Sequence, residues 1–240
     1  MLTMNHTITK LLAMLEEGQD ISTIDTLVSQ LLLPDAIRMY GPRQVFHFTE
    51  HPITGNVSTV VLHTTPDNLK GIKNKLETNL QPDIPKAAVD EMSHPEVFAE
   101  LNPAWVGSGY ETHLYQDMAW DTWIRTLIDV SGRFDDKFVY NKTGKVVDGA
   151  MLRKDLFPMD DLFFIAVAKR IKADYGISID ADWFEEHVHQ SLLRDYDEDL
   201  AENTWKYINI PALDKPIVLP EFVTQEEIEA EIDRIVKASK

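Results

Sequence analysis

The sequence contains no cysteine. Disulfide bonds, thiolate zinc sites, iron–sulfur clusters and cysteine nucleophiles are therefore all excluded. The sequence also lacks any apolar run close to the roughly 20 residues that a membrane-spanning helix needs. Its first residues have neither the basic flank nor the unbroken apolar stretch of a signal peptide. These absences predict a cytoplasmic protein that does not associate with membranes.

Basic residues are scarce. The chain has 23 Lys and Arg against 40 Asp and Glu, which gives a net charge of −17. The excess is strong in residues 151–240, where 20 acids face 11 basic residues. Binding to a phosphate backbone or to anionic lipid depends on Lys and Arg. The charge therefore argues against nucleic acid as a direct ligand, and its simplest meaning is solubility.

The spacing of apolar residues predicts both helices and strands. Apolar residues make up 44% of the 240 residues and charged residues 26%, which is enough for a packed core. Runs rich in Val, Thr and aromatic residues predict two hairpins, at residues 44–64 and 137–147. Apolar residues three and four positions apart predict helices. The predicted helices cover residues 1–18, 24–33, 66–76, 117–130, 160–176 and 183–192, with Asp117 and Asp182 as the N-caps of the fourth and the last.

These elements predict an α+β fold, in which two separate hairpins contribute to a small antiparallel sheet packed by amphipathic helices. Residues 1–208 would form the globular body. A junction between two subdomains would fall within residues 81–104, which contain four prolines. Residues 209–240 would form a proline-rich extended arm that carries a terminal helix.

The C-terminal arm is the predicted interaction surface. Pro211, Pro216 and Pro220 prevent a helix there, and a helix then begins with a capping box of Thr224 and Glu227. The leading hypothesis is a non-enzymatic interaction or assembly protein without a cofactor, whose arm docks on a protein partner or on a second copy in a homo-oligomer. The alternative is an arm that folds back on its own body. The residues that would contact the partner are Ile217, Val218, Leu219, Ile228, Ile232 and Ile235.

The densest group of titratable side chains lies within residues 180–202, which contain nine acids and two histidines. Glu185 and His189 are four positions apart on one helix face, a spacing that suits two ligands of one ion. His187 would point elsewhere on a regular helix. The second hypothesis is therefore a divalent-metal-dependent hydrolase, and the alternative is a solvated acidic face. The candidate ligands are Glu185, His189, Asp195, Asp197 and Asp199.

Two further motifs match in letters but not in context. His47 and His51 belong to a His-x-x-Glu-His sequence, but the residues around them favour a strand, where they would lie about 13 Å apart. The hairpin would instead place His63 opposite His47, and such a pair could bind a metal or respond to pH.

A calcium-binding loop is also suggested by the acids at 195, 197 and 199. Such a loop needs glycine at its sixth position and a bidentate acid at its twelfth. Leu200 and Lys206 occupy those positions, so an EF-hand is rejected. A third hypothesis for the function is an acidic mimic of nucleic acid, which would need carboxylates at the phosphate spacing of a duplex.

Overall fold

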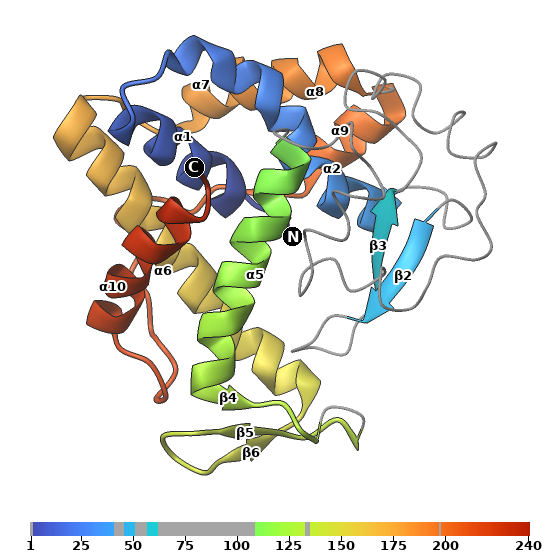
Figure 1. Cartoon of the computed structure of the whole chain (residues 1–240), viewed down its shortest axis with the longest axis vertical. Coiled ribbons are helices and arrows are strands. Elements are labelled where there is room, and N and C mark those ends of the chain that lie inside the picture. Colours follow the sequence, from blue (N-terminus) through green and yellow to red (C-terminus); the bar gives the residue numbers. More distant parts are fainter. Residues whose placement is uncertain (1, 41–45, 51–56, 62–108, 133–134, 197) are drawn as a thin grey trace.

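The computed structural model describes residues 2–40, 46–50, 57–61, 109–132, 135–196 and 198–240 (Figure 1). The chain is of mixed helix and strand and is mostly helical. In chain order the elements are β1 (Leu2–Thr3), α1 (Asn5–Glu16), η1 (Ile21–Thr23), α2 (Ile24–Tyr40), β2 (Phe46–Glu50), β3 (Val57–Val61), α5 (Gly109–Leu127), β4 (Ile128–Asp129), β5 (Phe138–Tyr140), β6 (Val146–Val147), α6 (Gly149–Tyr175), α7 (Ala181–Phe184), the π-helical turn η7 (Glu185–His189), α8 (Gln190–Asp195), α9 (Glu198–Lys206), β7 (Ile208–Asn209) and α10 (Gln225–Lys237).

Helices from the two ends of the chain pack together. Helix α10 contacts α1, α5 and α6, and α1 also contacts α6 (Figure 1). Their facing side chains belong to one apolar core, which includes Leu12 of α1, Ile124 of α5, Phe163 of α6 and Ile232 of α10. Strand β1 pairs in parallel with β7 and so joins the start of the chain to its last third. The packing therefore brings α1, α5 and α10 to one place.

The described strands form separate small sheets rather than the single sheet that was predicted. Strands β2 and β3 pair antiparallel, and β4, β5 and β6 form a three-stranded antiparallel sheet. The reason is their neighbours: β3 lies against α2, whereas β4 continues directly from the end of α5. In the β2–β3 register Val60 lies opposite His47, so the predicted pairing of His47 with His63 is wrong. His51, His63, the predicted helix 66–76 and the junction 81–104 lie outside the described residues.

Two helices are longer than their sequences indicated. Helix α2 continues through Pro34 to Tyr40, although a stop before the proline was predicted. Proline removes one backbone donor, so it interrupts the hydrogen bonds of a helix without always ending it. Helix α5 begins at Gly109 and not near residue 117. Asp117, which the sequence favoured as an N-cap, therefore lies about two turns inside the helix.

The boundaries of α6 and α7 also differ from the prediction. Helix α6 begins at Gly149, where the Asp148 carboxylate accepts a hydrogen bond of 2.8 Å from the Met151 backbone. Its first turns do have apolar residues at helical spacing, Leu152, Leu156 and Met159, but Pro158 among them argues against a helix when the sequence is taken alone. Helix α7 is capped by Asp180 instead of Asp182, because the Asp180 carboxylate accepts from the Trp183 backbone.

The C-terminal helix docks on its own chain. Thr224 and Glu227 form the predicted capping box, with both reciprocal hydrogen bonds present. The apolar stripe of α10 faces α1, α5 and α6, and the side chains of Ile228, Ile232 and Ile235 are all buried. Arg170 of α6 fixes the outer face of this contact through an ion pair with Asp233.

Within the described part of the chain, no helix combines the length and the apolar character that crossing a membrane would require.

The contribution of the Thr224 cap to the stability of the chain can be measured directly. Replacing Thr224 with alanine removes the hydroxyl that accepts the Glu227 backbone N–H at 3.2 Å. We expect the free energy of unfolding to fall by about 1 kcal/mol, the usual cost of losing such a cap. Urea denaturation measures the change, and Thr224→Ser, which keeps the hydroxyl, is the control. An alanine variant as stable as the wild type would show that the cap contributes nothing.

Candidate metal site

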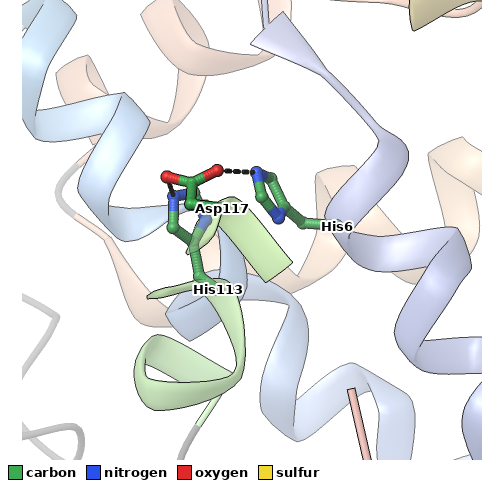
Figure 2. Close-up of side chains that lie close together, drawn as sticks. All are labelled: His6, His113 and Asp117. Carbon is green, nitrogen blue, oxygen red and sulfur yellow. Dashed lines mark ion pairs between the residues drawn. The ribbon is translucent and has the colours of Figure 1, made fainter. Parts of the chain in front are cut away.

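Three ligand-type side chains meet where α1 faces α5 (Figure 2). One Asp117 carboxylate oxygen lies 3.3 Å from His6 Nε2, and the other lies 3.2 Å from His113 Nε2. The three ligand atoms all lie within 4.8 Å of one another. In the described ranges no other group of three or more His, Asp or Glu side chains meets this condition.

The local structure explains why these side chains converge. His113 and Asp117 are four residues apart on α5, so they lie on the same face of that helix. His6 belongs to the first turn of α1, which begins at Asn5. The side chain of His113 is buried, with 2% exposed, and that of His6 is 13% exposed. The side chain of Asp117 is 30% exposed.

A close approach of α5 to α2 positions the buried side chain of His113. A Cβ atom at Gly109 would lie 2.7 Å from the backbone oxygen of Leu27, so only glycine fits there without displacing the backbone. The Gly109 N–H donates to Gln30 Oε1 of α2 at 2.9 Å. One turn later, His113 Nδ1 lies 2.7 Å from the carbonyl oxygen of Leu31. Hydrogen bonds at Gly109 and at His113 thus hold the N-terminal turns of α5 against α2.

These outer hydrogen bonds decide which ring nitrogens face the carboxylate. The Leu31 carbonyl can only accept, so His113 Nδ1 carries the proton. His6 Nδ1 lies 2.6 Å from Gln116 Oε1, and the Gln116 amide nitrogen donates to the His6 carbonyl at 3.2 Å. The amide oxygen therefore accepts from His6 Nδ1. Both neutral rings then present the lone pair of Nε2 towards Asp117.

Asp117 is held as a carboxylate. Removal from water raises its pKa, but the positive charges and hydrogen bonds that His113 and His6 supply in their protonated forms outweigh that effect and hold the pKa well below its usual range. The two imidazole rings stack with their centroids 3.8 Å apart. Two imidazolium ions in stacked contact repel each other, whereas two neutral rings turn two lone pairs towards a carboxylate. A cation placed between the three groups relieves this conflict.

The three side chains are close enough together to share one ion. Their ligand atoms lie within 4.8 Å of one another, and the nitrogen–oxygen distances of 3.2 and 3.3 Å run to the two different oxygens of Asp117. Metal-binding histidines also donate their other ring N–H to a carbonyl or a similar acceptor, and both histidines here do so.

The predicted ligands of the 180–202 cluster are only partly brought together. His189 Nδ1 lies 2.8 Å from Glu185, as the spacing predicted, and His189 Nε2 lies 3.3 Å from Glu202. The two acids contact opposite nitrogens of the ring, and the ring stacks on Trp205 at 4.5 Å. One ion cannot bind both nitrogens of one imidazole, so the three side chains do not surround a common point.

The candidate acids at the end of α8 and after it have other contacts. The Asp195 carboxylate accepts from Ser29 Oγ at 2.7 Å and pairs with Arg194, whose Nη2 lies 2.6 Å away. Asp199 is exposed on α9, and Asp197 lies outside the described residues. His187 contacts Asp25 of α2 at 2.8 Å, away from His189 as predicted. Metal binding by this cluster remains a prediction.

The arm residues are mostly covered by their own chain. Ile228, Ile232 and Ile235, which the sequence offered to a partner, are buried against α1, α5 and α6 and cannot meet a partner in this conformation. The sequence predicts this apolar stripe correctly, but the same amphipathic pattern fits a helix that packs on a partner and a helix that packs on its own chain. Val218 is 85% exposed, while Ile217 and Leu219 are half-buried.

Sequence reasoning did not single out the three residues of this site. Asp117 was interpreted as a helix cap, because the helix was expected to begin there. With α5 extended to Gly109, the pair His113 and Asp117 has the same spacing as Glu185 and His189, and this was the available signal. Nothing in the sequence near His6 indicates that it joins them, because that contact arises only when α1 packs on α5.

Replacing Gly109 with alanine tests the close approach. An added methyl in an open helix would stabilise the chain by about 0.8–1 kcal/mol. Here it would collide with the Leu27 carbonyl and push α5 away from α2. We expect a loss of about 1–3 kcal/mol in the free energy of unfolding, measured by urea denaturation. A gain in stability would contradict the contact.

Comparisons with known proteins give no relative from which to transfer a function. Neither protein-family models, nor curated proteins, nor solved structures include a match to this chain. We therefore infer the chemistry of the candidate site from the geometry of its own residues.

Proposed function

We propose that the protein binds one divalent transition-metal ion through His6 Nε2, His113 Nε2 and the carboxylate of Asp117. The observation that supports it most directly is the outer set of hydrogen bonds. Both Nδ1 atoms are engaged by acceptors, so both Nε2 atoms face one carboxylate at 3.2–3.3 Å. This is the pattern by which proteins orient histidine ligands.

The donor set favours certain metals. Imidazole nitrogen suits zinc and the late first-row ions, whereas magnesium and calcium prefer sites made of oxygen. Two nitrogens and one carboxylate therefore favour Zn²⁺, Co²⁺, Ni²⁺ or Fe²⁺ over Mg²⁺ and Ca²⁺. Among these ions Zn²⁺ accepts a tetrahedral arrangement most readily.

Three protein ligands leave one position of a tetrahedral ion for water or another ligand. A zinc-bound water can lose its proton near pH 7, which is the basis of zinc-dependent hydrolysis. In support of a hydrolase, these three converging side chains are better arranged to bind an ion than the described side chains of the 180–202 cluster. The ion would also link α1 to α5.

Docking of the arm on a protein partner and mimicry of nucleic acid stay as predictions. The first now depends on Ile217, Val218 and Leu219, since the side chains of α10 are covered. A single strongly exposed residue, Val218, does not define a surface. Metal binding at His6, His113 and Asp117 has the better support, because several independent contacts agree on it.

Calorimetric titration with metal ions tests the proposal. We expect wild-type protein to bind one Zn²⁺ or Co²⁺ per chain and to give no comparable heat with Mg²⁺ or Ca²⁺. Removing a direct ligand, in His113→Ala or Asp117→Asn, should weaken binding by more than about 100-fold, because loss of outer hydrogen bonds alone costs about 10- to 100-fold.

The matched control for these variants is His189→Ala. It removes a histidine that also lies between carboxylates but outside the site. Zinc affinity in this variant should equal that of the wild type. The reverse result, with binding lost in His189→Ala and retained in Asp117→Asn, would move the metal site to the 180–202 cluster. No binding by the wild type would refute metal binding altogether.

Metal binding should also raise thermal stability. A ligand that binds only the folded state stabilises it by about 2.7 kcal/mol at 100 times its Kd. For a chain of this size we expect Zn²⁺ at that excess to raise Tm by about 5–10 °C. Differential scanning calorimetry measures the shift, and chelation by EDTA should reverse it. An equal shift in Asp117→Asn would indicate that zinc acts elsewhere.

A further inference from the structure

We infer that Gln116 and Ser239 are positioning residues that set the affinity of the metal site and couple it to the end of α10. This inference rests on the proposed function, because it concerns the same site. Neither side chain would touch the ion. They act through His6, whose ring orientation and tautomer they determine.

Gln116 connects His6 to the end of α10. Its side chain is buried and makes three hydrogen bonds. Its Oε1 lies 2.6 Å from His6 Nδ1, and its Nε2 donates to the His6 carbonyl at 3.2 Å and to Ser239 Oγ at 2.8 Å. Because an amide has a donor end and an acceptor end, these partners allow only one orientation of Gln116.

Ser239 strengthens that orientation from α10. Its hydroxyl donates to the carbonyl of Ile235 at 3.1 Å, so the oxygen is left to accept from Gln116. The backbone of Ser239 is fixed as well, since its carbonyl accepts from Lys10 Nζ of α1 at 2.7 Å. Both Ser239 and Lys10 are buried, so water does not readily replace these contacts.

The four groups form a chain of hydrogen bonds with one polarity. The Ile235 carbonyl accepts from Ser239, Ser239 accepts from Gln116, and Gln116 accepts from His6 Nδ1. His6 Nδ1 therefore keeps its proton, and Nε2 keeps the lone pair that an ion needs. If the Gln116 amide rotated by half a turn, its N–H would face Nδ1, and the proton would move to Nε2 and block the metal.

The expected effect of Ser239 is moderate. The His6 carbonyl also requires the present orientation of Gln116, at the longer distance of 3.2 Å, so the orientation is weakened but not lost without the hydroxyl. Outer-shell substitutions of this kind lower metal affinity by about 10- to 100-fold. Ser239→Ala should fall near the lower end of that range. By linkage, the bound ion must stabilise the last turn of α10 to the same extent.

A pair of serine-to-alanine variants tests the inference. Ser239→Ala removes the hydroxyl of the chain, and Ser191→Ala removes another buried serine hydroxyl that also bonds a carbonyl four residues earlier. Calorimetric titration with Zn²⁺ should show about 10-fold weaker binding in Ser239→Ala and wild-type affinity in Ser191→Ala. Equal affinity in wild type and Ser239→Ala would overturn the inference and leave the proposed metal site intact. No zinc binding by the wild type would overturn both.

Two measurements separate positioning from a general loss of structure. Nitrogen-15 NMR of the histidine rings in metal-free protein should show His6 protonated at Nδ1 in the wild type and shifted towards the Nε2 form in Ser239→Ala. Hydrogen exchange in the wild type needs no variant: Zn²⁺ should slow exchange of the Ser239 amide, which donates to the Val236 carbonyl. Unchanged His6 tautomers or zinc-independent exchange at Ser239 would each contradict the coupling.

Discussion

The hydrogen bonds to Nδ1 of His6 and His113 are the constraint on which the candidate site depends. Two histidines beside an aspartate could form simple ion pairs, with protons on the nitrogens that face the carboxylate. Here the opposite nitrogens are committed to the Leu31 carbonyl and to Gln116, both of which accept. A neutral ring then has no proton left for Asp117, and the facing lone pairs suit a cation.

This constraint is supplied by helices that are distant in sequence. Gly109 lets α5 approach the backbone of α2, and that approach brings His113 to the Leu31 carbonyl. Packing of α10 on α5 brings Ser239 to Gln116. The tertiary packing of α1, α2, α5 and α10 thus sets which nitrogen of each ring lies against an acceptor outside the site. We expect a local change in any of these contacts to alter the hydrogen bonds of His6 or His113 and to leave the charge of the site unchanged.

Features specified by neighbouring residues could be predicted from the sequence. The capping box at Thr224, the end of α6 at Gly176 and the apolar stripe of α10 depend on side chains a few positions apart, and the structure contains all three. The start of α5 could not be found in this way. Glycine has a low helix propensity, and its role at position 109 is to allow the close contact with α2, which the sequence does not show. That error concealed the site, because it turned Asp117 from a mid-helix residue into a cap.

The course of residues 210–227 shows which part of its own chain the C-terminal arm contacts. Between β7 and α10 the chain runs beside the β5–β6 hairpin, where Phe222 packs on Tyr140 with ring centroids 4.2 Å apart. Lys142 of the turn pairs with Glu227 at 2.6 Å. Residues 210–224 form neither helix nor strand, and turns at residues 213–214 and 221–222 precede α10. The packing of α10 on α5 then places the Ser239 hydroxyl against Gln116, which in turn contacts His6 of the same chain.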